Sequence, residues 1–258
     1  MNILDKIIQH KKEEVSISKK HISIQELKSS EFYERESFSL KQSIQQRTGI
    51  IAEFKRKSPS KGIINNTSNV QNVCLAYEKF GASGISILTD KNFFGGNSED
   101  ILQVRKSIKL PILRKDFMID EYQFYEAKAM GADVVLLIAS CLSVSQTQEF
   151  THIAKELNLE VLLEIHNEDE LKHINQNIDI VGINNRNLKD FKVDLQHSII
   201  LKNNLPKDKL SVAESGIYSE EDFKFLRNKG FDAFLMGEYF MRNQSPEKAF
   251  ENFVKNTK

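Results

Sequence analysis

Short apolar runs recur along the chain from residue 50 onward, and polar segments separate them. The runs lie at residues 50–54, 85–88, 110–113, 134–138, 161–163, 178–183, 210–213 and 233–236. They are rich in Ile, Val and Leu, as expected for strands that are buried on both faces of a parallel sheet. Intervening segments such as 121–130 and 219–229 are long enough for a helix. The pattern therefore predicts eight strands that alternate with helices.

A weak internal repeat supports this alternation. Gly81, Gly131 and Gly230 each follow a helical segment and come shortly before an apolar run, which is typical of a helix that ends in a glycine cap. Gly131 lies 50 residues after Gly81, and Gly230 lies 99 residues after Gly131. With about 26 residues for each strand and helix, these spacings are close to two and four units. We therefore expect an α/β fold, a (β/α)8 TIM barrel, rather than a doubly wound open sheet, because no G-x-G-x-x-G follows the first run.

The first part of the chain has a different pattern. Residues 3–20 are mostly polar, with apolar residues that recur at spacings near three and four, which predicts an amphipathic helix. Residues 21–48 are polar with scattered Leu, Ile and Phe, and suggest a second short helical stretch. We expect residues 1–258 to form a single barrel domain, of which residues 1–48 are a helical N-terminal extension.

Composition and charge narrow the class of partner. Hydrophobic residues make up 40% of the 258 residues, as in an ordinary globular protein, and Lys plus Arg equals Asp plus Glu at 36 each. A net charge of zero favours neither nucleic acid nor a membrane as partner. Cys74 and Cys141 form no CxxC, and no signal peptide or membrane span is recognisable. We expect a cytoplasmic monomer with buried thiols that acts on a small molecule.

Polar and charged residues gather at the ends of the predicted strands. Because side chains along a strand alternate between its two faces, some of these residues are expected to point into the barrel. They are Glu53, Lys55, Lys115, Glu164, Asn184, Arg186 and Glu214. Any one of them is explained by an exposed rim charge or a structural ion pair. Together they lie at matching ends of five strands, where the active sites of barrels are found. Lys115 and Glu164 are candidates for an acid and a base.

The last two predicted strands end in glycine-containing loops. Ser215-Gly216 and Gly237-Glu238 occupy the positions where barrels commonly bind a phosphate group. Arg114 and the loop at 58–62 are further candidates for phosphate binding. Phe93-Phe94, before two glycines, is compatible both with core packing and with the wall of a pocket for an apolar ring.

Other catalytic chemistries have little support. The six histidines lack HxH or HExxH spacing, so we assign them surface or packing roles and expect no metal site. Ser215 lacks the sequence flanks of a nucleophile elbow.

These motifs resemble those of the indole-3-glycerol-phosphate synthases. The matching stretches are IIAEFKRKSPSKG, LTDKNFFGG, LPILRKDFMID, LLEIHN, VGINNRNL, VAESGI and FLMGEYFMR, together with the opening ILDKIIQHKKEEV. The resemblance covers nearly the whole chain in order. It implies ring closure of 1-(2-carboxyphenylamino)-1-deoxyribulose 5-phosphate to indole-3-glycerol phosphate, with loss of carbon dioxide and water and without a cofactor, in tryptophan biosynthesis.

The resemblance also implies roles for individual residues. Lys115 matches the general acid at the substrate carbonyl, Glu164 its charge partner and proton acceptor, and Lys55 a second lysine near the carboxylate and the dehydration step. The remaining catalytic positions are Glu53, Asn184 and Glu214, and the substrate-binding positions are Arg186, Ser58, Phe93, Phe117, Ser215, Gly216, Gly237 and Glu238. The alternatives are another sugar-phosphate barrel, such as the isomerase of the preceding step, and a catalytically silent phosphate-binding barrel.

Overall fold

Eight parallel strands close into a barrel in the computed structural model, which describes residues 3–186 and 192–257. Around the barrel the strands follow the order β1-β10-β9-β8-β7-β6-β5-β4, and β1 pairs with both β10 and β4 to close it. Their bounds are β1 Ile50–Phe54, β4 Gly84–Leu88, β5 Ile112–Lys115, β6 Val134–Ile138, β7 Glu160–Ile165, β8 Ile180–Asn184, β9 Leu210–Glu214 and β10 Ala233–Met236. The predicted (β/α)8 barrel is confirmed.

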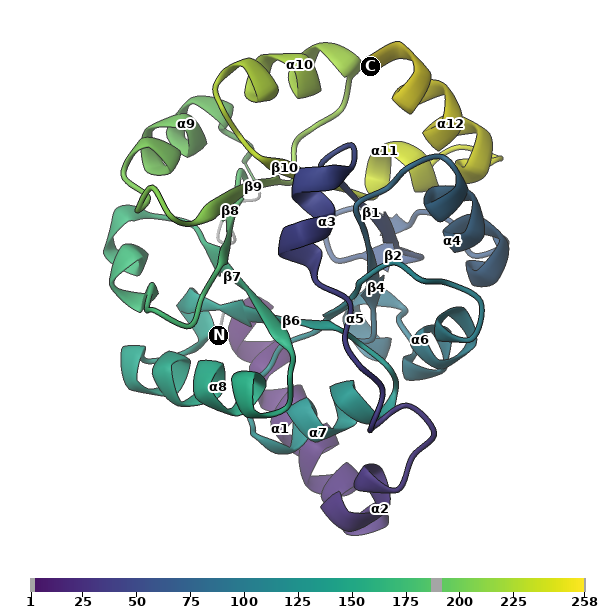
Figure 1. Ribbon diagram of the computed structural model, residues 1–258, viewed down its shortest axis with the longest axis vertical. Helices are drawn as coiled ribbons and strands as arrows, with labels where there is room; N and C mark the ends of the chain where they lie inside the picture. The colour runs from purple at the N-terminus through teal and green to yellow at the C-terminus, as the bar shows by residue number, and fades with distance from the viewer. Residues whose placement is uncertain (1–2, 187–191, 258) are drawn as a thin grey trace.

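Helices surround the barrel as a ring (Figure 1). They are α4 Val70–Lys79, α6 Ser98–Arg105, α7 Tyr122–Ala129, α8 Val144–Glu156, α9 Leu195–Asn203, α10 Glu220–Asn228 and α12 Pro246–Thr257. Shorter turns of helix follow four of the strands: α5 Lys91–Phe94, η1 Ala139–Cys141, η2 Glu168–His173 and α11 Glu238–Met241. Gly81, Gly131 and Gly230 have φ of 98°, 87° and 83°, so they end α4, α7 and α10 in the left-handed conformation that the repeat predicted.

Alternation along the strands separates two buried regions. Ile51 belongs to the cluster inside the barrel together with Leu113 and Leu162, whereas Ala52 and Phe54 belong to the larger cluster between the strands and the helices. Because successive side chains point to opposite faces, the inward face of β1 continues from Ile51 to Glu53. The same alternation carries β5 from Leu113 to Lys115.

The residues before the barrel contact both of its ends. They form α1 Ile3–His21, α2 Ile24–Lys28 and α3 Leu40–Gln46, so the segment 21–48 contains two short helices rather than one. Helix α3 lies across the end of the barrel that faces the viewer in Figure 1, where Leu40 and Ile44 join the inner cluster. Helix α1 lies behind the barrel in this view and reaches the opposite end.

Two details differ from the predicted elements. The run 110–113 becomes a strand only from Ile112 and continues to Lys115, since Pro111 has no N–H to donate to the ladder and contributes only its carbonyl, which accepts from the N–H of Ile85 at 3.0 Å. The loop after β1 contains an antiparallel hairpin, β2 Lys57–Ser58 and β3 Gly62–Ile63, which its polar sequence did not predict.

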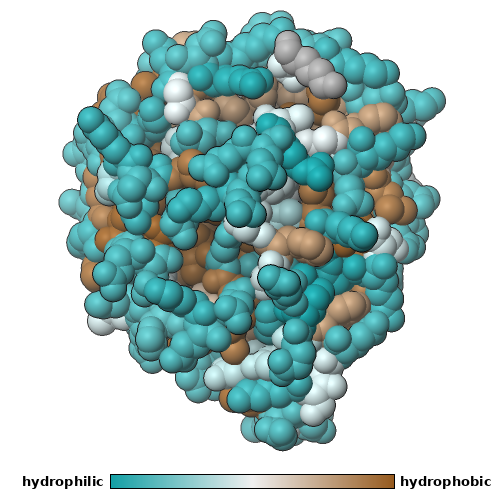
Figure 2. Space-filling view, viewed as in Figure 1, coloured by the Kyte–Doolittle hydropathy of each residue, from teal (hydrophilic) through white to brown (hydrophobic). Residues whose placement is uncertain are grey.

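The surface and the cysteines complete the description. The face in Figure 2 is mainly hydrophilic, with smaller hydrophobic areas between polar side chains. Among the described residues, no helix combines the length and the apolar character needed to cross a membrane. Cys74 and Cys141 are both free thiols, and Cys74 is buried as expected whereas Cys141 is only half-buried.

Candidate active site

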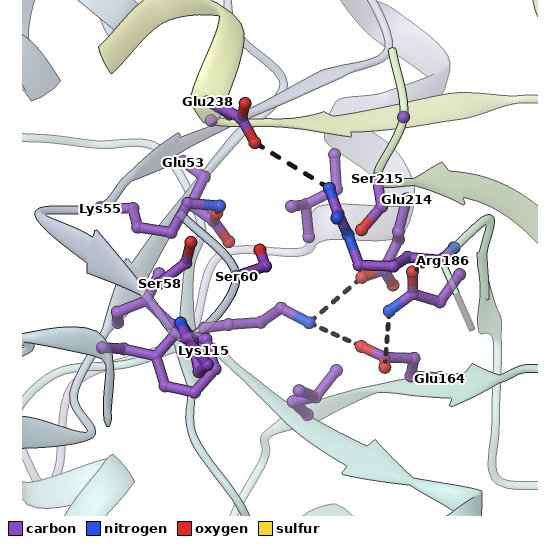
Figure 3. Close-up of a pocket in the computed structure, with 18 of the residues that line it drawn as sticks. Glu53, Lys55, Ser58, Ser60, Lys115, Glu164, Arg186, Glu214, Ser215 and Glu238 are labelled. Carbon is purple, nitrogen blue, oxygen red and sulfur yellow. Dashed lines mark hydrogen bonds and ion pairs between the residues drawn. The ribbon is translucent and has the colours of Figure 1, made fainter. Parts of the chain in front are cut away.

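A cavity opens at the carboxyl ends of the barrel strands (Figure 3). It is lined by nearly every site residue expected from the sequence, namely Glu53, Lys55, Ser58, Lys115, Phe117, Glu164, Asn184, Arg186, Glu214, Ser215, Gly216, Gly237 and Glu238. These residues come from the ends of five barrel strands (β1, β5, β7, β8 and β9), from the segments that follow them, and from the segment that follows β10. Parallel strands in one barrel end on the same side, which is why residues separated by up to 185 positions in the sequence meet here.

Lys115 is the central cation of the cavity. Its Nζ lies 2.7 Å from Oε2 of Glu164 and 3.1 Å from Oε2 of Glu214 (Figure 3), and its side chain is 14% exposed. Burial alone would lower the pKa of Lys115, but the two carboxyl groups outweigh that effect and raise it above its ordinary value. The amine is therefore an ammonium across the physiological pH range.

The two carboxyl groups beside Lys115 have pKa values shifted in opposite directions. Burial opposes ionisation of Glu164, yet Lys115 and His166 together hold its pKa well below the usual range, and Asn184 Nδ2 donates to its Oε1 at 3.0 Å. Burial raises the pKa of Glu214 to about 8, because the attraction of Lys115 is offset by the charge on Glu164. Near neutral pH Lys115 thus lies between one ionised and one protonated carboxyl group, an arrangement suited to acid–base chemistry.

A second pair of charges lies at the carboxyl end of β1, with Glu53 on the strand and Lys55 just after it. Lys55 Nζ donates to Oε1 of Glu53 at 2.6 Å, and the hydroxyl of Ser86 donates to the other carboxylate oxygen at 3.2 Å. Glu53 is buried whereas Lys55 is half-buried, so the lysine is the member of the pair that a ligand can reach. The carboxylate holds the Lys55 ammonium at the edge of the cavity.

Two glycines leave room for these carboxylates. A Cβ at Gly182 would lie 1.9 Å from Oε1 of Glu214, and a Cβ at Gly237 would lie 2.7 Å from Oε1 of Glu53. Contacts this short do not occur between real atoms, so any side chain at either position would push a carboxylate away. The absence of a side chain at positions 182 and 237 therefore allows Glu214 and Glu53 to occupy their positions.

The loops after β9 and β10 face the same cavity. Ser215 and Gly216 have φ of 64° and 72°, and the carbonyl of Ser215 accepts from Asn185 Nδ2 at 2.7 Å. Beyond β10, the Glu238 carboxylate lies 4.0 Å from Arg186 Nη2 and 3.7 Å from Lys61 Nζ. Arg186 and the two loops thus lie on one side of the cavity, where the Glu238 carboxylate faces Arg186.

Two expected residues do not lie in the cavity. Phe93 packs against the ring of His10 with centroids 5.9 Å apart, whereas Phe94 lines the cavity and its ring lies 6.0 Å from that of Phe117. Successive residues in the helical turn α5 point about 100° apart, so only one of the two rings can face inward. Arg114 is on the outer face of β5, where it donates to the carbonyl of Gln123 at 2.8 Å and contacts Glu126, so the expectation that it helps to bind phosphate is wrong.

The site also contains residues that the sequence did not predict. His166, which was assigned a surface or packing role, places Nε2 3.2 Å from Glu164 and Nδ1 3.4 Å from Glu170. The contact with Glu164 had a signal in the sequence, because the two residues are two positions apart and share a face. The cavity is also lined by three residues of α1, Ile3, Leu4 and Ile7. The sequence of an amphipathic helix does not show which part of the barrel its apolar face contacts.

Comparisons with known proteins agree with this geometry. The family model described as indole-3-glycerol phosphate synthase matches residues 4–253. The indole-3-glycerol phosphate synthase of Bacteroides thetaiotaomicron is 48% identical over 255 residues, and that of Legionella pneumophila (strain Paris) is 40% identical over 254 residues; each alignment covers 98% of both chains.

Solved structures are similar in fold. A chain of the tryptophan synthase complex from Pyrococcus furiosus superimposes with a TM-score of 0.60 at 16% identity, covering 82% of this chain and 98% of that chain. At this identity the likeness concerns the barrel alone. The family match over nearly the whole chain and the two relatives go further: this chain belongs to the indole-3-glycerol phosphate synthase family.

Proposed function

We propose that this protein closes an indole ring. It converts 1-(2-carboxyphenylamino)-1-deoxyribulose 5-phosphate into indole-3-glycerol phosphate, carbon dioxide and water, as a carboxy-lyase of tryptophan biosynthesis. Membership of the family supports this reaction. The observation that carries the proposal is the buried amine of Lys115, which lies 2.7 Å from Glu164 and 3.1 Å from Glu214 inside the cavity.

The first step forms a carbon–carbon bond. The ring carbon that bears the carboxylate attacks the ketone carbon, and the carbonyl oxygen gains the electron pair and takes a proton from Lys115. A preorganised cation at a developing alkoxide stabilises the transition state more than the ground state. The carbon–carboxylate bond then breaks as carbon dioxide leaves, and its electrons restore the aromatic ring. Lys55, at the edge of the cavity, is placed to pair with the departing carboxylate.

The second step eliminates water. The hydroxyl made in the first step leaves with a proton from a neutral acid, a role that suits the protonated Glu214. The neighbouring carbon loses a proton to a base, a role that suits the ionised Glu164, and the ring double bond forms. No electrons pass to or from an external carrier in either step, so we propose no cofactor.

The cavity has suitable surroundings for both ends of the proposed substrate, the aromatic ring and the phosphate. Phe94 and Phe117 offer two aromatic faces for the carboxyphenyl ring. The loops at Ser215-Gly216 and Gly237-Glu238, with Arg186, form the side of the cavity that suits the phosphate. Ser58, in the β2–β3 hairpin, and Asn184, on β8, line the space between the two ends and complete the proposed set of binding and catalytic residues.

The organisation of the chain follows from the same proposal. We infer that residues 1–258 fold as one unit with residues 1–48 as a helical N-terminal extension, and that the protein acts as a cytoplasmic monomer. The contacts of the extension with both ends of the barrel support the single folded unit. Light scattering on the purified chain tests the mass, and a dimer would contradict it.

The direct test is turnover by the purified chain. Addition of the carboxyphenylamino sugar phosphate is expected to give a rise in indole fluorescence and release of one carbon dioxide for each product molecule. Binding of the substrate without either signal would instead support a catalytically silent barrel. Consumption of the phosphoribosyl precursor without decarboxylation would support the isomerase of the preceding step.

A further inference from the structure

Lys11 is a fully buried lysine that the proposed chemistry does not use. It lies on α1, one turn after Ile7, and its side chain has 0% exposure. Its Nζ contacts three carboxylates: Asp116 at 2.9 Å, Asp90 at 3.2 Å and Glu14 at 2.9 Å. Asp90 and Asp116 are themselves 1% exposed, whereas Glu14 is half-exposed and lies on the same helix.

Buried charges are unfavourable unless opposite charges and hydrogen bonds stabilise them, and this cluster contains both. Burial alone would lower the pKa of Lys11, but Asp116, Asp90 and Glu14 together raise it above the ordinary value, and Lys11 and Arg114 keep the pKa of Asp116 below its usual range. Thr89 Oγ1 also donates to Asp116 Oδ2 at 2.6 Å, and Arg114 approaches the same oxygen at 3.3 Å. Removal of one member would leave unpaired buried charge, so the cluster holds its parts in one arrangement.

Each buried aspartate also holds an aromatic residue of the cavity. The second oxygen of Asp90, Oδ1, accepts from the backbone N–H of Phe93 at 2.8 Å and of Phe94 at 3.3 Å, and so begins the helical turn α5. Asp116 Oδ1 accepts from the backbone N–H of Phe117 at 2.8 Å. One lysine is therefore bonded to the two carboxylates that fix the backbone of Phe94 and Phe117.

The same lysine also anchors α1 over the cavity. Ile3, Ile7 and Lys11 are four residues apart and share one face of the helix. Ile3 and Ile7 line the cavity, and Lys11 ties that face to the ends of β4 and β5 through Asp90 and Asp116. The ion pairs of Lys11 therefore hold both α1, with Ile3 and Ile7, and the backbone of Phe94 and Phe117 at the cavity.

We propose that Lys11 is a positioning residue that sets the pocket for the substrate's aromatic ring. It acts through Asp90 and Asp116 on Phe94 and Phe117, and it leaves the phosphate side of the cavity unaffected. The inference rests on the proposed function, because that function supplies a substrate with an aromatic ring at one end and a phosphate at the other. It predicts that loss of Lys11 affects the two ends of the substrate differently.

Lys11→Met tests this difference, since it keeps the length and apolar stem of the side chain and removes the charge. Calorimetric titration of the full chain with two probes, anthranilate for the ring and inorganic phosphate for the other end, reports each side separately. We expect anthranilate affinity to fall about tenfold and phosphate affinity to stay within about twofold. In the turnover assay, KM is expected to rise by a larger factor than kcat falls.

Two further variants separate positioning from general stability. Lys19→Met removes a second, more exposed ion pair between α1 and the barrel: Lys19 is 44% exposed and lies 2.8 Å from Asp120. Both probes should bind to this variant as to the wild type. Asp90→Asn keeps an oxygen for the N–H groups of Phe93 and Phe94 but loses the charge. It should weaken anthranilate binding in the same direction as Lys11→Met, and the double variant should be less impaired than the sum of the two.

The outcomes distinguish this inference from the proposed function. Equal loss of both probes in Lys11→Met, or loss of neither, would overturn the positioning role even if the wild type turns over. Absence of turnover in the wild type would overturn the proposed function, whereas the calorimetry would still report on Lys11. If Lys11→Met fails to fold, Asp90→Asn decides: unchanged anthranilate affinity in that variant contradicts the inference.

Discussion

At the scale of single residues, Lys115 occupies the position where the proposed mechanism develops negative charge. Lys115→Met removes the ammonium but keeps a side chain of similar length between Glu164 and Glu214. Because the charge acts chiefly in the transition state, we expect kcat to fall by about a hundredfold or more while the substrate still binds. Steady-state kinetics and calorimetric binding measure the two effects, and a kcat near that of the wild type would contradict the role of general acid.

Glu214 determines how activity changes on the alkaline side. Its pKa, raised to about 8, means that it is neutral at pH 7 and becomes a second anion beside Glu164 above pH 8. That anion would repel the carboxylate and phosphate of the proposed substrate, so kcat/KM should decline through this range. Lys115 does not explain such a decline, because its pKa is raised above the ordinary value for lysine.

Glu214→Gln isolates this contribution, since glutamine keeps the shape and stays neutral. We expect the decline of kcat/KM near pH 8 to disappear from its pH profile, whatever the remaining rate. The profile is measured from pH 5 to about pH 10 in buffers of constant ionic strength. An alkaline limb that persists unchanged in the variant would mean that another group titrates there.

At the scale of elements, the loop after β9 combines a left-handed backbone at Gly216 with a close approach to its neighbour. Gly216 has φ of 72°, and a Cβ there would lie 2.3 Å from Cγ1 of Val193. Gly216→Ala should therefore move the loop and weaken binding of inorganic phosphate, by about tenfold if one well-placed hydrogen bond is lost.

Gly81→Ala is the matched control for this loop. Gly81 has φ of 98°, but its added Cβ would make only an ordinary contact at 3.5 Å with Thr48, at the end of the barrel away from the cavity. It should cost stability through backbone strain and leave phosphate affinity unchanged. Equal phosphate affinity in the two variants would argue against the loop after β9 as a phosphate site.

At the scale of the whole molecule, the two ends of the barrel have different tasks. Helix α3 closes one end with Leu40 and Ile44, whose side chains are buried in the inner cluster. Leu40→Ala should lower the free energy of unfolding by about 2–5 kcal/mol, because it leaves a cavity in this cluster. Urea denaturation measures the loss, and kcat and KM of the folded protein should remain those of the wild type; a large change in either would show that the ends are coupled.

Sequence alone predicted much of the architecture and of the site. The eight apolar runs located the strand boundaries to within two residues, because strands covered on both faces must be apolar. The two-residue period then placed Glu53, Lys55, Lys115, Glu164, Asn184 and Glu214 on inward faces. These predictions depend on local chain geometry, which the sequence encodes directly, and the family resemblance depends on short motifs within single loops and strand ends.

Only the tertiary structure decided which groups interact. The choice of Phe94 over Phe93 depends on how the helical turn α5 is rotated against the barrel. The two aspartates that contact Lys11 lie 79 and 105 residues away in the sequence. The opposite pKa shifts of Glu164 and Glu214 likewise depend on burial and on distances to Lys115, which no spacing of residues reveals. Periodicity determines the direction in which a side chain points, whereas long-range packing determines what it meets there.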